Sequence, residues 1–235
     1  MTASWRDWRA RVEIVFRHVD WRALGPVYFH EGGERELRGR RGAMLDLGEE
    51  WARAANRLLP EGGRSLWAGA GIGDLPAMLA EALLKGREVI GANLRRKECR
   101  ILSDALGMAG LSDALRIEEM DARKVAGRIG RFDHLAAVGL FTDPETYPAL
   151  SGVAYGRIPP PALDLEAFER ERREARELAS GLFDPLTCPG LITTTAEEAA
   201  WFLERASDAR VEPVGPSIPT AILGDPVGFL RVTAA

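Results

Sequence analysis

The first part of the chain carries large apolar side chains at helical spacing. They are Trp5, Trp8, Val12, Val15, Phe16 and Val19. Because a repeat of 3.6 residues places such side chains on one face of a helix, the pattern predicts a helix over residues 4–19. A second helix is predicted over residues 43–59, ending at the turn residues 60–63. Between the two helices, the polar and aromatic residues 28–33 are interpreted as a loop.

From residue 64 onward, short apolar runs alternate with helical patterns. Strands are predicted over residues 65–68, 88–92, 115–118, 132–140 and 191–195, and helices over residues 74–85, 95–106, 164–182 and 197–206. This alternation is typical of βαβ units, whose strands pair in parallel in one sheet. The last two runs, residues 210–214 and 227–232, leave no room for a helix between them, so we expect an antiparallel pair.

Together these elements predict a three-layer α/β fold. Its sheet has seven strands, mostly parallel with a terminal antiparallel strand, and helices cover both faces. We expect this domain over residues 61–235 and a helical N-terminal appendage, or lid, over residues 1–60. The pattern lapses for about twenty residues after the fourth strand, and a long irregular stretch inside a compact domain is usually functional.

Composition narrows the class of protein. A chain of 235 residues with 46% apolar and 28% charged residues is typical of one globular domain. The first residues are too charged for a secretory signal and no apolar run is long enough to span a membrane, so we expect a cytoplasmic protein without membrane contact. The net charge of -4 argues against a nucleic-acid partner held by bulk electrostatics. Arginines cluster in the first 43 residues, which we interpret as a solvated helix surface, with an anion or RNA contact as the alternative.

The two cysteines are Cys99 and Cys188. Neither lies in a CxxC motif or a Cys/His cluster. We therefore expect two separate thiols and no structural metal.

The strongest local signal is the turn Gly69-Ala70-Gly71-Ile72-Gly73, between the first predicted strand and the helix after it. Glycines let the backbone approach a ligand closely, and a helix N-terminus favours a polar or anionic group. A dinucleotide-binding turn needs glycine at position 74, where this chain has Asp74. Because a carboxylate there would repel a pyrophosphate, NAD and FAD are disfavoured.

Two further segments end strands beside this turn: Gly91-Ala92-Asn93 after the second strand and Met120-Asp121-Ala122 after the third. With the glycine turn, they make residues 60–235 resemble the class I S-adenosylmethionine-dependent methyltransferases. Phe132-Asp133, Pro189-Gly190 and the terminal antiparallel pair support the resemblance.

The resemblance implies S-adenosylmethionine as the cofactor. In that family the turn holds the methionine part, the residue that ends the second strand bonds the ribose, and the acid after the third strand contacts the adenine amine. Those last two roles fall to Asn93 and Asp121. The cofactor-binding residues implied are Gly69, Ala70, Gly71, Gly73, Asn93, Leu94, Asp121, Ala122 and Val138. For Asp121, a cap of the turn after the third strand is the alternative interpretation.

Two positions depart from the family pattern. Trp67 stands where the glycine motif usually begins with an acid, and Asn93 stands where the ribose usually meets one. An amide can still bond a hydroxyl, but without the charge that strengthens the bond. The methionine ammonium group then needs another partner, for which Asp74 and Asp143 are candidates, or the ligand is an altered one.

The candidates for catalysis are Asp143 and Glu145, because reacting groups gather at the carboxyl ends of parallel strands. Either could act as a general base or orient an amine, while turn formation at Asp143-Pro144 is the alternative. Two further hypotheses concern a lid over the pocket and a wall of the substrate site. The lid would use Tyr28, His30 and Glu31, and the wall Cys99, Tyr147 and Tyr155. His134, inside the fourth predicted strand, is interpreted as a hydrogen-bonded histidine of the core or of its rim.

The function predicted from these residues is methyl transfer from S-adenosylmethionine to a small-molecule substrate. One alternative is transfer of the aminocarboxypropyl arm, as in nicotianamine-synthase-like enzymes, whose glycine turn is also followed by Leu-Pro, here Leu75-Pro76. The other is a binding protein that has the fold and no activity. A homodimer formed through the N-terminal helix is a further hypothesis.

Overall fold

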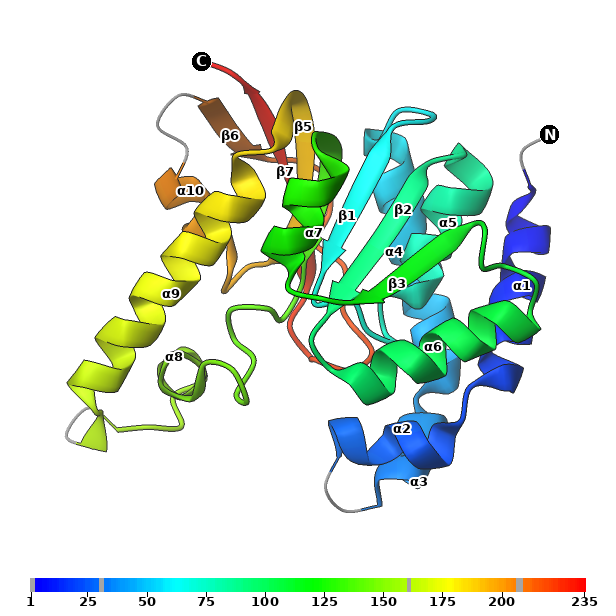
Figure 1. Cartoon of the computed structure of the whole chain (residues 1–235), viewed down its shortest axis with the longest axis horizontal. Helices are drawn as coiled ribbons and strands as arrows, with labels where there is room; N and C mark the ends of the chain where they lie inside the picture. Colours follow the sequence, from blue (N-terminus) through cyan, green and yellow to red (C-terminus); the bar gives the residue numbers. More distant parts are fainter. Residues whose placement is uncertain (1–2, 30–31, 160–161, 206–208) are drawn as a thin grey trace.

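A computed structural model describes residues 3–29, 32–159, 162–205 and 209–235. Within these residues, a seven-stranded sheet lies between two layers of helices (Figure 1). The strands are β1 (Arg64–Ala68), β2 (Glu88–Asn93), β3 (Leu115–Glu119), β4 (Phe132–Ala137), β5 (Leu186–Thr195), β6 (Ala209–Pro213) and β7 (Val227–Ala234). Their order in the sheet is β3-β2-β1-β4-β5-β7-β6. Strands β1 to β5 pair in parallel, and β7 runs antiparallel to both of its neighbours. The predicted fold class is therefore confirmed.

Ten helices are found in the described residues. They are α1 (Trp5–His18), α2 (Trp21–Tyr28), α3 (Gly33–Gly39), α4 (Arg41–Leu58), α5 (Leu75–Lys85), α6 (Arg96–Met108), α7 (Ala122–Ile129), α8 (Pro148–Ala154), α9 (Leu165–Phe183) and α10 (Ala199–Arg205). Helices α1, α4, α5 and α6 share one apolar core with the sheet, and α7, α9 and α10 share the other.

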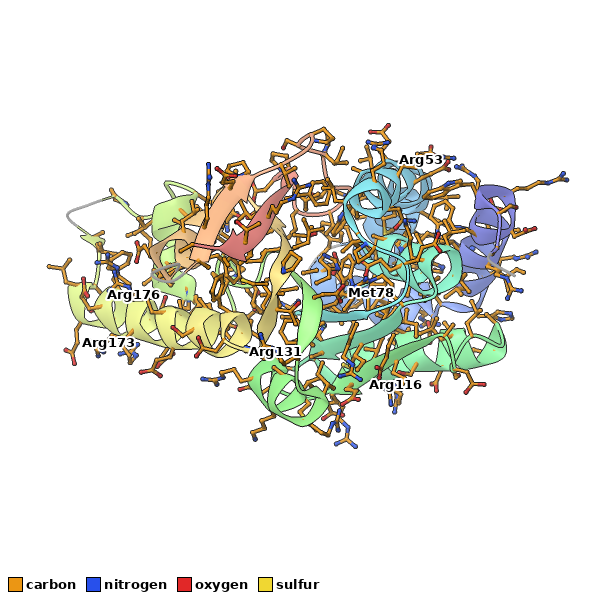
Figure 2. All side chains as sticks on the ribbon, turned by 90° about the horizontal axis from the view of Figure 1, so that it is seen from above. Arg53, Met78, Arg116, Arg131, Arg173 and Arg176 are labelled. Atoms are coloured by element: carbon orange, nitrogen blue, oxygen red, sulfur yellow. The ribbon has the colours of Figure 1, made fainter. Side chains whose placement is uncertain are left out.

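The two cores follow from alternation along the strands. In β1, Trp67 points to the first core while Leu66 and Ala68 point to the second, as the two-residue period of a strand requires. Figure 2 shows Met78 of α5 inside the molecule and the labelled arginines at its periphery. Both faces of the parallel strands are thus covered, which leaves their ends free to form a site.

Helix α1 is tied to the segment that follows the glycine turn. It begins at a capping box, in which Ser4 and Asp7 bond each other's backbone N–H. The indole Nε1 of the buried Trp8 donates to the carbonyl oxygen of Pro76, at 3.0 Å. The first turn of α5 is therefore held both by the sheet and by the N-terminal helix.

Four helices were not predicted from the sequence: α2, α3, α7 and α8. Each is only seven or eight residues long, and α2 contains Pro26, so no helical period is long enough to be recognised. Strand β4 also ends at Ala137 rather than at residue 140, and β5 begins earlier, at Leu186. His30, Glu31 and residue 206, where predictions were also made, lie outside the described residues. The division of the chain at residue 60 stays a prediction.

The structure also bears on the predictions about membrane spans and about the two cysteines. In the described ranges, no helix has the length and apolar character needed to cross a bilayer. Cys99 is buried in α6 and Cys188 is exposed in β5, and both are free thiols.

Candidate functional site

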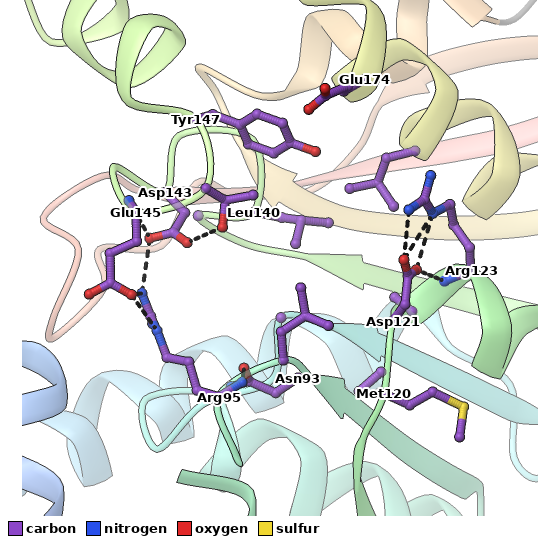
Figure 3. Close-up of a pocket in the computed structure, with 17 residues that line it drawn as sticks. Asn93, Arg95, Met120, Asp121, Arg123, Leu140, Asp143, Glu145, Tyr147 and Glu174 are labelled. Carbon is purple, nitrogen blue, oxygen red and sulfur yellow. Dashed lines mark hydrogen bonds and ion pairs between the residues drawn. The ribbon is translucent and has the colours of Figure 1, made fainter. Parts of the chain in front are cut away.

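A pocket of about 390 Å³ opens at the carboxyl ends of the parallel strands (Figure 3). Gly69 lines it after β1, residues 93–95 at the end of β2, and residues 120–123 after β3. Part of the loop from Gly139 to Tyr147 and two residues of α9 complete the wall. Its volume lies in the range of about 300–1,000 Å³ that small-molecule sites occupy. Its position between β1 and β4, where the strand order reverses, is the usual place for a ligand in such sheets.

Glycine at position 69 keeps the pocket open at the turn. Its φ of 78° lies in the left-handed region, and a Cβ there would come 3.3 Å from Cδ1 of Leu140. The N–H groups of Gly69 and Ala70 both donate to the carbonyl oxygen of Ala92, which ties the turn to β2.

The structure brings most of the predicted site residues together, though their roles stay predictions. Those that line the pocket are Gly69, Asn93, Leu94, Asp121, Ala122, Asp143 and Glu145. Gly73 and Val138 line a second, apolar pocket of about 30 Å³ instead, together with Trp51 and Ile222. Ala70 and Gly71 line neither, because the turn is covered at these positions.

The side chains of Tyr28, Asp74 and Glu98 cover the glycine turn. The N–H of Gly71 donates to Asp74, at 2.8 Å, and the N–H of Ile72 donates to the hydroxyl of Tyr28 and to Glu98, at 3.1 Å each. A Cβ on Gly71 would lie 2.5 Å from the Tyr28 hydroxyl oxygen. These two N–H groups, which the sequence predicts to face a ligand, are therefore already bonded.

Glu98 is the centre of this cover and was not predicted as a site residue. Its side chain, in the first turn of α6, is 1% exposed and accepts hydrogen bonds from Tyr28 and from Nδ2 of Asn93 as well as from Ile72. Burial raises the pKa of Glu98. Burial and the nearby Glu98 charge raise the pKa of Tyr28 well above its ordinary value, so the phenol stays a hydrogen-bond donor. The only sequence signal for Glu98 is its position five residues after Asn93.

Asn93 acts as a link between the turn and α6. Its Nδ2 also donates to the carbonyl oxygen of Ala70, at 2.8 Å, and its Oδ1 accepts from the N–H of Arg95, at 2.8 Å. Both ends of the amide are thus bonded within the protein. The predicted contact of Asn93 with a ribose stays a prediction.

Asp121 lies at the opposite end of the pocket from the glycine turn. It contacts both the backbone and the side chain of Arg123. It accepts the N–H of Arg123 as the N-cap of α7, at 2.8 Å, and its carboxylate pairs with the Arg123 guanidinium, at 2.6 Å. These hydrogen bonds lower the pKa of Asp121. The carboxylate is therefore ionised at neutral pH. It also caps α7, as the alternative interpretation predicted.

The two predicted catalytic carboxylates share one arginine. Arg95 pairs with Asp143 at 2.9 Å and with Glu145 at 3.0 Å, and Figure 3 shows the three side chains together on one side of the pocket. Asp143 also accepts a hydrogen bond from the Thr146 hydroxyl, at 2.7 Å. The loop after β4 is thus held closed on Arg95, a residue that the sequence did not single out.

Tyr147 presents a polar group to the pocket. The residue is 5% exposed, and Figure 3 shows its ring entering from the loop with the hydroxyl toward the pocket interior, near Glu174. Burial raises the pKa of Tyr147. Of the three residues proposed for a substrate wall, Tyr147 alone lines this pocket: Tyr155 bonds Asp225, and Cys99 is packed against the Asn93 carbonyl.

The sequence matches no protein-family model, and no curated protein sequence is significantly similar to it. Solved structures do share its architecture. A Pyrococcus horikoshii protein provisionally classed as a transferase superposes with a TM-score of 0.51 at 15% identity, covering 82% of this chain and 64% of its own. TrmN of Thermus thermophilus gives a TM-score of 0.49 at 18% identity, over 81% of this chain and 47% of its own. A variant of MtNAS gives a TM-score of 0.47 at 14% identity, covering 97% of this chain and 71% of its own.

At these identities the likeness concerns the fold. The seven-stranded, mostly parallel sheet with an antiparallel β7 is the α/β architecture that the sequence predicted, and the Pyrococcus horikoshii protein shares this fold. The chain spans less than two thirds of the length of the Pyrococcus horikoshii protein and about half of TrmN. Activity and substrate therefore have to be argued from the site.

Proposed function

We propose that the pocket binds the adenosyl part of S-adenosylmethionine and that the protein transfers the methyl group to a small-molecule acceptor. The observation that carries the proposal is the pocket's lining, which runs from Gly69 to Asp121 along the carboxyl ends of β1, β2 and β3. An ionised acid at one end and a glycine at the other are the features that the fold uses to hold a nucleoside. The fold and the sequence resemblance support this assignment.

The residues present fit an adenosine group. Leu94 is 67% exposed although it is large and apolar, and it lines the pocket with Met120, so an aromatic base would cover apolar surface there. The Asp121 carboxylate would accept a hydrogen bond from the exocyclic amine. Ala122 would complete the adenine end.

The chemistry asked of the protein is modest. S-adenosylmethionine, when bound, supplies a methyl group on a positively charged sulfur, which needs no further activation. The protein has to hold the acceptor beside it and exclude water, which can account for most of a rate enhancement. Leu140 and Tyr147 close the pocket on the β4 side. Asp143 or Glu145 would orient the acceptor or take its proton after release from Arg95.

Binding of the nucleoside is tested by calorimetry with S-adenosylmethionine and S-adenosylhomocysteine. We expect both to bind the unaltered protein, and we expect Asp121→Ala to weaken binding about tenfold or more, because a charge-assisted hydrogen bond is lost. Asp113→Ala is the matched control, since Asp113 is an exposed acid in the loop before β3. Dissociation constants above about 1 mM for both ligands, or equal affinities for the Asp121 variant, would contradict the proposal.

The product then identifies the reaction. With a panel of small acceptors, S-adenosylhomocysteine as product means methyl transfer. Methylthioadenosine as product means transfer of the aminocarboxypropyl arm and would overturn the proposed reaction while leaving the site in place. Binding without either product across the panel would favour the inactive binding protein.

A further inference from the structure

Two N–H groups of the glycine turn, those of Gly71 and Ile72, are already bonded to side chains of the protein. Backbone N–H groups at the start of a helix form a niche for an anion, such as a ligand carboxylate. Here the N–H of Gly71 bonds Asp74 and the N–H of Ile72 bonds Glu98. Two carboxylates of the chain therefore occupy the positions that a ligand carboxylate would take.

Displacing the Glu98 carboxylate from the turn would break several hydrogen bonds. Three donors converge on its carboxylate: the Ile72 N–H, the Tyr28 hydroxyl and Nδ2 of Asn93. A ligand carboxylate that took these donors would leave a fully buried Glu98 without partners. A buried carboxylate that loses its hydrogen-bond partners is strongly destabilising.

Tyr28 adds a steric barrier above the turn. Its hydroxyl lies over Gly71, and its helix α2 is packed tightly against α3, since a Cβ on Gly25 would come 2.3 Å from the backbone of Gly33. The hydroxyl thus reaches the turn from a closely packed pair of helices. The lining of the pocket agrees with this barrier, because it includes Gly69 and stops short of Gly71.

Charge acts in the same direction. Asp74 and Glu98 lie on either side of the covered turn, and burial, with a contribution from the charge of Glu98, raises the pKa of Asp74 to about 7. Arg95, whose charge acts on Glu98, is already paired with Asp143 and Glu145. A ligand carboxylate at this turn would therefore meet two buried acidic side chains, while the guanidinium of Arg95 is engaged elsewhere.

We propose that Glu98 is a specificity-determining residue that fills the anion niche of the turn, so that the pocket recognises the nucleoside part of its ligand and not an amino-acid carboxylate. The ligand class that follows is 5′-thioadenosines, with or without an amino-acid arm. This inference rests on the proposed function, because it assumes that the pocket holds an adenosyl group. The same inference explains why Trp67 can stand where the resemblance implies an acid. An aminocarboxypropyl arm that is not held at the turn needs no carboxylate for its ammonium group there.

The test compares two thioethers whose sulfur is uncharged, methylthioadenosine and S-adenosylhomocysteine. They differ only in that S-adenosylhomocysteine carries the aminocarboxypropyl arm where methylthioadenosine carries a methyl group. By calorimetry, we expect the unaltered protein to bind them with affinities within about threefold of each other, since the arm adds little. A preference of tenfold or more for S-adenosylhomocysteine would overturn the inference and leave the proposed function intact. Binding of neither would refute the proposed function itself, and the inference with it.

A pair of variants tests Glu98 directly. Glu98→Ala empties the niche, so we expect the preference for S-adenosylhomocysteine to rise about tenfold, as a newly formed charge-assisted hydrogen bond would give. Glu98→Gln keeps the niche filled and should keep the two affinities similar. An unchanged ratio in a folded Glu98→Ala protein would show that the carboxylate does not set the specificity. If that variant does not fold, the ratio in the unaltered protein and in Glu98→Gln decides the question.

Discussion

Glu198 accepts a hydrogen bond from the backbone N–H of Phe141 at 2.6 Å, so a carboxylate that follows β5 holds the loop that follows β4. The same carboxylate accepts the N–H groups of Gly139 and Thr142, at 2.9 and 3.0 Å, and its side chain is 0% exposed. This loop continues into Asp143 and Glu145. One wall of the pocket therefore depends on a residue that does not line it.

Replacing Glu198 should weaken both stability and binding. Glu198→Ala leaves three backbone N–H groups without an acceptor, each worth about 1 kcal/mol or more, so we expect a loss of roughly 3 kcal/mol in the free energy of unfolding. Denaturant unfolding measures this loss, and calorimetry with S-adenosylhomocysteine should show weaker binding. Glu197→Ala is the control, because Glu197 is its exposed neighbour. Equal losses in the two variants would contradict the role given to Glu198.

The stability of the protein should fall as the pH rises from about 4 to about 7, and the fall should end just above that pH. Burial raises the pKa values of Asp74 and Glu198 to about 7 each, so the folded state holds protons there that the unfolded state has released. The free energy of unfolding is therefore higher at about pH 6 than at about pH 8. Melting temperatures across this range test the sign. Asp74→Asn keeps an oxygen acceptor for the N–H of Gly71 and should flatten the dependence, and a slope unchanged in this variant would exclude Asp74 as a cause.

Adding a methyl group at Gly69 should affect both folding and the pocket. Gly69→Ala puts a side chain on a left-handed residue, at about 1–2 kcal/mol, and directs it at Leu140 beside the pocket. We expect lower stability and weaker binding of S-adenosylhomocysteine. Gly110→Ala is the matched control, since Gly110 has a φ of 68° with no atom near its Cβ position. It should lose similar stability and no affinity. Equal affinity in both variants would place the ligand elsewhere.

A buried network beneath the sheet should be sensitive to single replacements. His134 of β4 contacts Glu81 through Nδ1, at 3.0 Å, and Thr193 through Nε2, at 2.9 Å, and Ser65 donates to Glu81. Glu81→Ala removes the partner of three buried groups, Ser65, His134 and the guanidinium of Arg87, so we expect a loss of roughly 3–5 kcal/mol in the free energy of unfolding. The exposed Glu169→Ala, which breaks a surface pair with Arg172, should lose less than about 0.5 kcal/mol. Similar losses for the two would refute the network's importance.

Much of the fold could be predicted because its long elements have clear periods. The helix predicted over residues 4–19 is α1 (Trp5–His18), and the antiparallel pair predicted at the end of the chain is β6 and β7. His134 is a buried core residue, as predicted. Helix α7, with eight residues and an internal glycine, is stabilised by its buried contacts with α9 and the sheet, which a local pattern does not reveal.

The site was predicted less completely, for a physical reason. Residues that end neighbouring parallel strands meet by topology, so Asn93, Asp121 and Asp143 could be placed at one pocket from the sequence alone. The contact between Tyr28 and Glu98 joins residues 70 positions apart, and Tyr28 lies on α2, a helix outside the repeating βαβ pattern that contains α6. Such a contact depends on how α2 packs, and no spacing in the sequence encodes it.

The placement of β7 has a consequence for the order in which the sheet can assemble. In the strand order, β6 joins the sheet through β7, although β6 comes first along the chain. Residues 209–213 therefore gain a pairing partner only when residues 227–234 form β7. Contacts between residues that are distant in the sequence form slowly in folding. Until then the edge of β5 stays unpaired and open to other chains. Insertion of β7 therefore completes two strand pairings at once, with β5 on one side and β6 on the other.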